Sequence, residues 1–398
     1  MRVDRRQVVL GALAGAGFGV ASPLWAQAGF DAWLGGFRAR ARAAGIRRAT
    51  LDKGLAGARY LPKVIELDQR QAEVAKPMQD YLASAASSAR ITGGQRALHK
   101  WGDTLGRIEK RTGVPAEVVV AIWGMESSFG GFRGSQPVIS VLATLAFEGR
   151  RAGRFEDELI AALKILQKGH ASPGQMVGSH AGAMGHTQFM PSTYLAHAVD
   201  GTGDGTRDIW GNDPRDALAS TAAYLKALGW RKGQPWGVEV ALPAGFDPGL
   251  TGRVLKRSRK DWTGLGVRLA DGGTLPDHGK GGIILPAGPR GPAFMIWENF
   301  QVLKGYNYAD SYVIGVGHLS DRIAGGGPIR SGFPDRPWGM TTDQRMALQR
   351  RLNAAGFNAG NPDGVIGEKG RAAIRAYEAS RGLRETGVPS VALLEALN

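Results

Sequence analysis

The stretch from 118 to 130 reads Val118-Val-Val-Ala-Ile-Trp-Gly-Met-Glu126-Ser-Ser-Phe-Gly130, an apolar run that ends in a single carboxylate. In a helix, Val119, Trp123 and Glu126 lie at i, i+4 and i+7, so the carboxylate shares the face that must be buried. Low dielectric and the negative end of the helix dipole both raise a carboxyl pKa, which predicts that Glu126 donates a proton near neutral pH. A general acid and a buried glutamate paired with a basic residue are equally compatible with this helix alone.

The composition is that of a folded, basic protein with more than one domain. The chain has 398 residues, of which 43% are hydrophobic, so two or three folded units are expected. Its 50 basic and 35 acidic side chains give a formal net charge of +15. This charge predicts an anionic partner such as nucleic acid, an anionic membrane surface or an acidic polymer, and composition does not choose among them.

The N-terminus has the pattern of a signal peptide. Met1-Arg-Val-Asp-Arg-Arg6 precedes a charge-free run over 8–25, and Ala26-Gln-Ala28 is a small-x-small cleavage pattern. A transmembrane anchor is the alternative, but the Gly- and Ala-rich run and the cleavage pattern favour export, with a mature chain that begins near Gly29. The Arg5-Arg6 pair is compatible with twin-arginine export as well as the general route. We therefore expect 1–28 to be removed.

The chain contains no cysteine. This excludes disulfides, a thiolate nucleophile and cysteine-based zinc sites. It also excludes a lipid-modified cysteine after the signal peptide. We therefore expect a soluble, exported, periplasmic protein with no membrane anchor after cleavage.

Hydrophobic periodicity predicts a mainly α protein with a small β insertion. Helical patterns occupy 30–145, 155–167, 213–228 and 307–322. Between 237 and 297, four short apolar runs are separated by Pro and Gly clusters, as in a small antiparallel sheet: 238–242, 266–269, 282–285 and 293–297. Residues 325–337 have the composition of a linker. The remaining unit, 338–398, has three helical segments: 342–355, 370–381 and 390–397.

A second informative segment is Gly178-Ser-His-Ala-Gly-Ala-Met-Gly-His-Thr-Gln-Phe-Met-Pro-Ser-Thr-Tyr194, whose small residues permit close backbone approach. Together with Glu-Ser-Ser-Phe-Gly upstream and Ala222-Ala-Tyr-Leu-Lys-Ala-Leu-Gly-Trp230 downstream, it resembles the lytic murein transglycosylase B family over about 30–323. The C-terminal unit separately resembles the common peptidoglycan-binding domain, through these matching residues: Leu348-Gln349, Leu352, Gly356, Asp363-Gly364, Gly367, Ala373-Ile374 and Gly382-Leu383.

The resemblance implies a lysozyme-like helical core over 29–324 that cleaves the glycosidic bond from N-acetylmuramic acid to N-acetylglucosamine without using water. Glu126 matches the catalytic residue, which acts first as acid and then as base and leaves a 1,6-anhydro ring. A glycosidase that uses water needs a second carboxylate, and none is obvious here. The nearby acids are Glu148 and a group at a polar helix start, where the dipole favours acids: Glu156, Asp157 and Glu158.

The resemblance also implies a set of substrate-binding residues. Ser179 and Gln188 match positions that contact the sugar at the reaction centre, and their alternative role is loop and cap hydrogen bonding. His180 departs from the aromatic residue usual in the family. Groove-lining positions, whose alternative is core packing, are matched by Tyr224, Tyr306, Asn307, Tyr312 and, more faintly, Tyr81. Arg150 and Arg151 suit stem-peptide carboxylates, with a solvated charge pair as the alternative.

The segment Asp200-Gly-Thr-Gly-Asp204-Gly-Thr-Arg-Asp208 partly matches a calcium-binding loop. It has acids at loop positions 1, 5 and 9, but position 12 is Gly211, so Asp213 or Asp216 would have to close a longer loop. The alternative is a turn held by Asp side chains and Gly. A bound Ca²⁺ or Na⁺ would be structural, and no cofactor is expected for the reaction.

These patterns favour a monomeric enzyme that acts on peptidoglycan glycan strands and their stem peptides. The alternatives are a muramidase that uses water and a catalytically silent scaffold that binds peptidoglycan, against which the retained Glu126 motif argues. A nucleic-acid partner would explain the net charge but not the signal peptide, and no nucleic-acid recognition motif is present.

Overall fold

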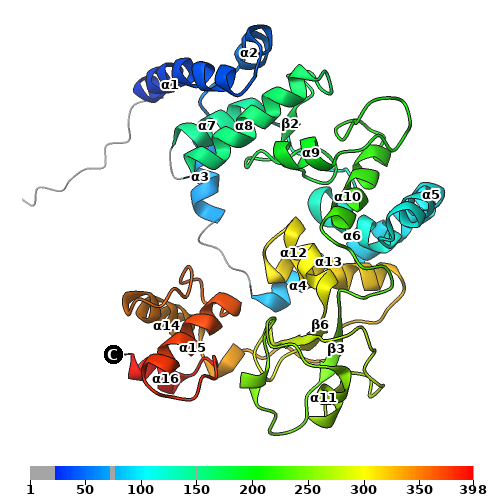
Figure 1. Ribbon diagram of the computed structural model, residues 1–398, viewed down its shortest axis with the longest axis vertical. Coiled ribbons are helices and arrows are strands. Elements are labelled where there is room, and N and C mark those ends of the chain that lie inside the picture. The colour runs from blue at the N-terminus through cyan, green and yellow to red at the C-terminus, as the bar shows by residue number, and fades with distance from the viewer. Residues whose placement is uncertain (1–22, 72–76, 149–150, 398) are drawn as a thin grey trace, which may run out of the picture.

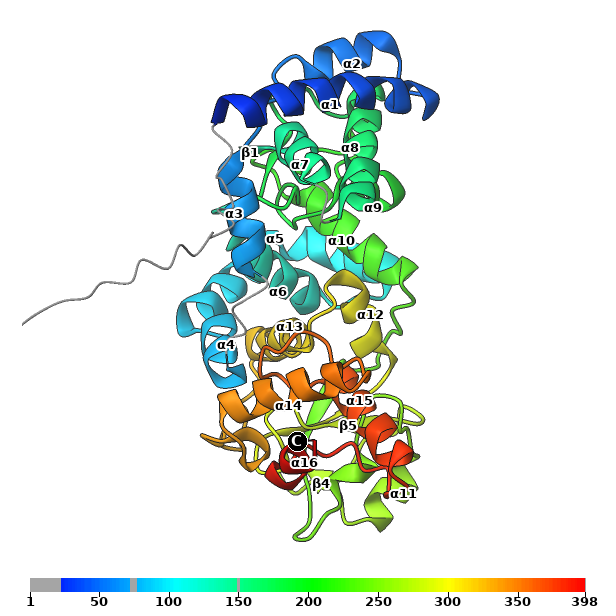
Figure 2. The ribbon, with the colours of Figure 1, turned by 90° about the vertical axis from the view of Figure 1, so that its left-hand side faces the viewer.

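The computed structural model describes residues 23–71, 77–148 and 151–397. Most of the predicted signal peptide, 1–22, therefore lies outside the described residues. Within the described part of the chain, no helix combines the length and apolar character needed to cross a membrane. The molecule is elongated, with α1 and α2 at one end and the β-rich insertion and C-terminal helices at the other (Figure 1, Figure 2).

One end of the molecule is a helical layer built around α7 and α8, which pack against each other. Its buried core includes Phe37, Leu142 and Leu163. The helices of this layer are α1 (Pro23–Ala43), α2 (Arg48–Leu55), α3 (Pro62–Gln71), α7 (Val138–Phe147), α8 (Ala152–Gln167) and α9 (Pro191–His197). A two-stranded ladder, β1 (Gln136–Pro137) with β2 (Val177–Gly178), joins the start of α7 to the loop before α9.

A second helical core surrounds α6 (Ala116–Ser127), in which every residue from Val118 to Gly124 is buried. A helix that is apolar all round belongs in the middle of a bundle, and α6 packs against α5, α10 and α13. The surrounding helices are α4 (Met78–Ala85), α5 (Ser88–Thr112), α10 (Arg215–Ala227), α12 (Glu298–Tyr306) and α13 (Asp310–Ile323).

The predicted β insertion is present as a four-stranded antiparallel sheet in the order β4-β3-β6-β5. Its strands are β3 (Gly237–Ala241), β4 (Arg268–Leu269), β5 (Gly282–Ile284) and β6 (Ala293–Ile296). The short helix α11 (Arg259–Gly264) begins with a capping box at Ser258 and buries Trp262 in the core of the insertion. A turn of 3₁₀ helix, η1 (Pro248–Leu250), lies in the loop between β3 and α11.

The C-terminal domain has the three predicted helices, α14 (Thr342–Ala354), α15 (Glu368–Ser380) and α16 (Val391–Ala396), around Leu348, Leu352 and Ile374. A second 3₁₀ turn, η2 (Pro337–Gly339), precedes them. This domain lies beside the insertion in Figure 1 and is hydrogen-bonded to it through Arg371.

Two predicted helix starts differ from the structure by three residues. The helix predicted over 155–167 begins at Ala152. The helix predicted over 307–322 begins at Asp310, and a separate helix, α12, lies directly before it. Asn307 is extended at the end of α12, and its side-chain oxygen accepts a hydrogen bond from the Ala309 amide (3.1 Å), which favours a turn over helix continuation.

Candidate active site

Glu126 lies in the last turn of α6 and is half-buried. The Tyr312 hydroxyl of α13 donates a hydrogen bond to its Oε1 (2.5 Å). Burial raises the pKa of Glu126 to about 7, although the hydrogen bond from Tyr312 acts in the opposite direction. Among the described residues, no basic side chain forms an ion pair with Glu126, so the structure favours the proton-donor interpretation over the buried ion pair.

Three tyrosines surround Glu126. The rings of Tyr306 and Tyr312 are parallel, with centroids 6.5 Å apart and planes at 4°. The charge of Glu126 contributes to raising the pKa of Tyr306, Tyr312 and Tyr81, although burial is the larger cause in each. The ring of Tyr224 packs against that of Tyr306, with centroids 5.5 Å apart. The Tyr224 hydroxyl donates a hydrogen bond to the Gly305 carbonyl (3.0 Å). Four tyrosines from three distant parts of the sequence therefore form one aromatic wall.

The loop from 178 to 194 is bound tightly to the end of α6. The Trp123 indole donates to Nδ1 of His186 (3.1 Å), and the Ser127 hydroxyl donates to the His186 carbonyl (2.5 Å). Because Nδ1 accepts, Nε2 carries the proton and donates to the Gly211 carbonyl (2.8 Å). Burial lowers the pKa of His186, which keeps the ring neutral. Sequence reasoning gave His186 no role, and its only signal was its position inside the Gly-rich motif.

Ser179 and Gln188 stabilise this loop from within. The Ser179 hydroxyl oxygen accepts hydrogen bonds from the amides of Ala181 (3.3 Å) and Ala183 (3.2 Å). Gln188 has a positive φ of 53°, and its side-chain amide donates to the carbonyls of Arg133 (3.2 Å) and Gly185 (2.8 Å). In this structure both side chains therefore make hydrogen bonds within the loop, which was the alternative to contact with the sugar. Their contact with the sugar remains a prediction.

The other predicted substrate-binding residues are more peripheral. Asn307 is exposed in the turn between α12 and α13. Arg151 is exposed at the start of α8, forms an ion pair with Asp68 and lies over the ring of Phe155 (5.1 Å). Arg150 lies outside the described residues.

The remaining acids of this region are engaged elsewhere. Glu148 accepts a hydrogen bond from Tyr60, and Glu156 pairs with Arg40 (2.7 Å). Glu158 is buried and accepts two hydrogen bonds from Ser192 (2.7 and 2.9 Å). Asp157 is exposed on α8. Within the described ranges, no other carboxylate contributes to the pKa of Glu126, so the site contains one acid rather than a pair.

A cleft of about 1180 Å³ lies between the catalytic helices, the insertion and the C-terminal domain. Tyr81 of α4 and Met125 of α6 form part of its wall, next to Glu126. Trp338, Arg345 and Gln349 line it from the C-terminal side. The cleft thus reaches Met125, the neighbour of Glu126 in the chain, although Glu126 itself does not line it.

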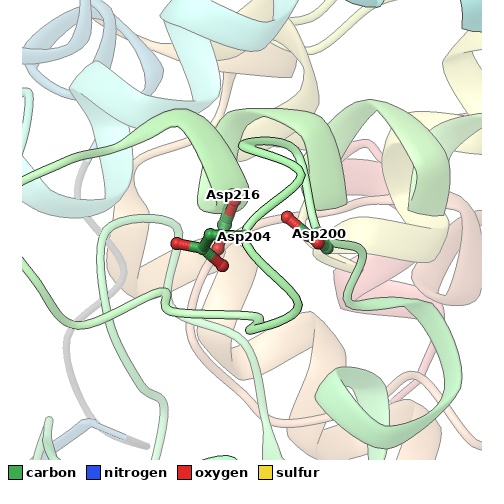
Figure 3. Close-up of side chains that lie close together, drawn as sticks. All are labelled: Asp200, Asp204 and Asp216. Carbon is green, nitrogen blue, oxygen red and sulfur yellow. The ribbon is translucent and has the colours of Figure 1, made fainter.

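The acidic loop brings three carboxylates together. Oxygens of Asp200, Asp204 and Asp216 lie within 4.8 Å of one another (Figure 3). Asp213 instead pairs with Arg215 (2.5 Å), and Asp208 accepts hydrogen bonds from the amides of Trp210 and Gly211. Of the two residues proposed to close the loop, Asp216 is therefore the one that lies with Asp200 and Asp204. All three carboxylates also accept hydrogen bonds from amides of the loop, which are the contacts of the alternative, a turn held by Asp side chains.

A helical core, an aromatic wall and one carboxyl group with a pKa near neutrality define the class of enzymes that cleave glycosidic bonds by acid–base catalysis. Within this class, residues 29–321 match the model for the transglycosylase SLT domain, and residues 341–397 match that for a putative peptidoglycan-binding domain. The chain belongs to the transglycosylase SLT family of lytic transglycosylases. This confirms the predicted family, activity and mainly α fold with a helical C-terminal domain.

Individual relatives agree with this membership. Membrane-bound lytic murein transglycosylase B of Escherichia coli is 33% identical, over 70% of this chain and 79% of that protein. SltB3 of Pseudomonas aeruginosa, solved in complex with NAG-anhNAM-pentapeptide, is 46% identical with a TM-score of 0.83, over 92% of this chain and 99% of SltB3. Slt35 of E. coli, solved in complex with calcium, is 30% identical with a TM-score of 0.63, over 75% of this chain and 93% of Slt35.

Proposed function

We propose that Glu126 carries both proton transfers in cleavage of the bond from N-acetylmuramic acid to N-acetylglucosamine in peptidoglycan. Its carboxyl group first protonates the glycosidic oxygen as the bond from that oxygen to C1 breaks. The resulting carboxylate then accepts the proton of the muramyl C6 hydroxyl as O6 bonds to C1. The 1,6-anhydro ring forms, no water is consumed, and Glu126 ends protonated as it began.

The single observation that supports this proposal most is the geometry of Glu126, a half-buried carboxyl group that is held by the Tyr312 hydroxyl and has no second acid beside it within the described residues. A pKa near the working pH suits a group that must both donate and accept a proton. Hydrolysis with retention or inversion would require a second carboxylate across the bond. The site thus favours the transglycosylase reaction over the muramidase alternative, and the acid held among tyrosines argues against a silent scaffold.

The substrate would lie along the aromatic wall. Sugar rings stack their apolar faces on aromatic side chains, for which the half-exposed Tyr81 and Tyr306 lie beside Glu126. Tyr312 is 6% exposed and packed in the main core, so it would act through its hydrogen bond to Glu126 rather than by stacking. Ser179, Gln188, Tyr224 and Asn307 would contact N-acetyl and hydroxyl groups, and Arg150 with Arg151 would bind stem-peptide carboxylates. The solved complexes of SltB3 with NAG-anhNAM-pentapeptide and NAG-NAM-pentapeptide support a substrate of this kind.

Glu126→Gln tests the assignment, because glutamine keeps the shape but cannot transfer a proton. We expect its turnover on purified sacculi to fall by at least about a thousandfold, while binding to sacculi is retained. Glu148→Gln is the matched control and should keep most of the activity, since Glu148 bonds to Tyr60 instead. Comparable turnover in Glu126→Gln and the wild type would remove Glu126 from the mechanism.

We further propose that the chain is exported to the periplasm, that 1–28 is cleaved, and that the mature protein is monomeric. The mature chain would comprise a catalytic region over 29–324, a linker over 325–337 and a peptidoglycan-binding domain over 338–398. The signal-peptide pattern and the absence of cysteine support export without a lipid anchor. N-terminal sequencing of the exported protein should begin near Gly29.

The acidic loop is proposed to bind a structural Ca²⁺, with Na⁺ as the alternative. Its donors are carboxylate oxygens, which suit a hard cation, and Slt35 has been solved in complex with calcium. Calcium should therefore raise the melting temperature of the wild type, and Asp204→Asn should abolish that increase. Asp213→Asn is the control, because Asp213 pairs with Arg215 outside the cluster. Equal responses of the two variants would argue against this site.

A further inference from the structure

The C-terminal domain is docked on the insertion through a buried arginine. Arg371 of α15 is 4% exposed and donates to the Thr251 hydroxyl (2.9 Å) and to the Pro248 carbonyl (2.9 Å). Its guanidinium also lies over the ring of Trp338 (5.6 Å). A buried guanidinium that loses these partners would be strongly destabilising, so this contact fixes the domain against η1 and the start of the loop that follows it.

The next residues of the same loop continue the contact toward the catalytic helices. The backbone amide of Arg253 donates to Oε2 of Glu368 (3.2 Å), the first residue of α15, and Oε1 of Glu368 is held by Arg375 (2.8 Å). The side chain of Arg253 extends the other way and pairs with Oδ1 of Asp310 (2.5 Å). Arg253 therefore bonds to the C-terminal domain with its backbone and to the catalytic region with its side chain.

Asp310 is the first residue of α13 and joins three elements. Its Oδ1 also accepts from Lys304 of α12 (2.6 Å), a lysine that is only 9% exposed. Two cations, Arg253 and Lys304, therefore share one partly buried carboxylate. Removal of Asp310 would leave the buried Lys304 without its counter-charge, which is destabilising. The carboxylate also lies at a helix N-terminus, where negative charge is favoured.

The first turn of α13 also carries Tyr312, whose hydroxyl bonds to Glu126. Tyr312 is two residues beyond Asp310, so a shift of this turn would move the hydroxyl relative to the carboxyl group. The packing of α13 against α6 fixes the rest of the helix. The Arg253–Asp310 ion pair thus links the insertion to the turn of α13 that orients Tyr312.

We propose that Arg253 and Asp310 are positioning residues, through which the docked C-terminal domain holds Tyr312 in register with Glu126. The C-terminal domain then contributes to catalysis on soluble substrate as well as to binding of the wall. This inference rests on the proposed role of Glu126.

The test compares Arg253→Met with Arg253→Lys in the full-length protein, acting on soluble peptidoglycan fragments. Arg253→Met should lower kcat by about tenfold, because the Tyr312–Glu126 bond is misaligned. Arg253 also lines the cleft, so a role in substrate binding would instead raise KM with kcat unchanged, which would contradict the positioning role. Arg253→Lys keeps a cation on Asp310 and should recover most of the activity. Asp310→Asn should resemble Arg253→Met, and Glu368→Ala should lower kcat by a smaller factor, about threefold.

A pH profile separates positioning from general destabilisation. The titratable groups that face Glu126 are Tyr81 of α4, Tyr306 of α12 and Tyr312 of α13. Loss of the Tyr312 hydrogen bond removes the contact that lowers the pKa of Glu126, so the basic limb of kcat should move to higher pH in Arg253→Met. A merely structural role would lower activity without moving this limb.

Arg384→Met is the matched control. It cuts the Arg384–Asp247 ion pair at the same domain interface without touching Asp310. The proposal predicts wild-type kcat and pH profile for this variant. Wild-type values in Arg253→Met, or equal losses in Arg253→Met and Arg384→Met, would overturn it. Absence of anhydro products from the wild type would instead contradict the proposed function, whatever the kinetics of the Arg253 variants.

Discussion

At the residue scale, the site depends on one carboxyl group and the hydroxyl that faces it. Burial raises the pKa of Glu126 to about 7, and the hydrogen bond from Tyr312 limits that increase. The same bond orients Oε1 toward α13, while the other oxygen has no hydrogen bond to a described residue. An acid that is tuned in this way can be protonated when it meets the substrate and remain a competent base after it has donated.

Tyr312→Phe should shift the pH dependence of turnover upward. Hydrogen bonds to charged groups contribute about 1.5–3 kcal/mol, so removal of this donor should raise the pKa of Glu126 by about one to two units. The basic limb of kcat against pH would move by the same amount, and kcat itself should fall because the carboxylate is less well oriented. An unmoved limb would show that the bond does not contribute to the acidity of Glu126.

Glu126→Gln should stabilise the protein in alkaline solution. The folded-state pKa is raised, so the folded protein binds more protons than the unfolded chain between pH 4.5 and about 7, and stability falls as pH rises through this window. Glutamine removes that loss, which amounts to up to about 3 kcal/mol at pH 8. Thermal melts at pH 5 and pH 8 provide the measurement.

Sequence reasoning was most successful for Glu126 and least successful for its partners. Helical spacing was sufficient to predict that a carboxylate would lie on a buried face. It could not decide between a general acid and an ion pair, because that depends on Tyr312, which is 186 positions away. His186 was missed for the same reason, since its role comes from contacts with Trp123 and Gly211.

At the element scale, the end of α6 and the loop from 178 to 194 form one unit. Gly134 lies where they meet, next to β1, with a φ of +83°. A Cβ at this position would lie 2.2 Å from the backbone of Gly178. This close approach brings Arg133 within hydrogen-bonding distance of Gln188. The small residues of the motif therefore allow close backbone packing beside the carboxyl group.

Gly134→Ala should disrupt this approach. Both the positive φ and the clash with backbone atoms oppose alanine, and a cost of about 1–3 kcal/mol or more is expected. Activity should fall more than stability, because the displaced loop carries Ser179 and Gln188. Gly203→Ala is a useful control, since it also has a positive φ but no neighbour within 4 Å of a Cβ. Equal activity losses in the two variants would contradict the packing argument.

The strands of the insertion were predicted to within two residues, because short apolar runs between Pro and Gly clusters have few alternatives. The predicted run 266–269 became β4 (Arg268–Leu269), since Gly266 adopts a positive φ and cannot continue the strand. Helix α12 was not predicted because it follows β6 almost directly, with Trp297 between them and no turn residue to mark the change.

At the scale of the whole molecule, the segment predicted as a linker is packed rather than free. The amides of Arg330 and Ser331 donate to the Glu239 carboxylate (2.8 and 2.7 Å). Phe333 packs against the main core, and the C-terminal domain beyond it is held by Arg371. Composition alone could not predict this docking, because the sequence does not show which surface a single residue such as Glu239 or Arg371 contacts.

Net charge should contribute to association with the wall. With a formal charge of +15, the protein should sediment less with intact sacculi as salt concentration rises, since surface charges are screened beyond a Debye length. Catalysis on short soluble fragments should respond less, because the reaction takes place at a half-buried carboxyl group. Salt-independent sedimentation would assign wall affinity to the groove and the C-terminal domain alone.

Mass spectrometry of the soluble products released from purified sacculi tests the central claim most directly. The account predicts that the wild type releases muropeptides lighter by one water than hydrolysis products, with muramyl ends that resist reduction. Glu126→Gln should release none above background. Reducible ends from the wild type, or anhydro ends from Glu126→Gln, would contradict the account of Glu126 as both acid and base.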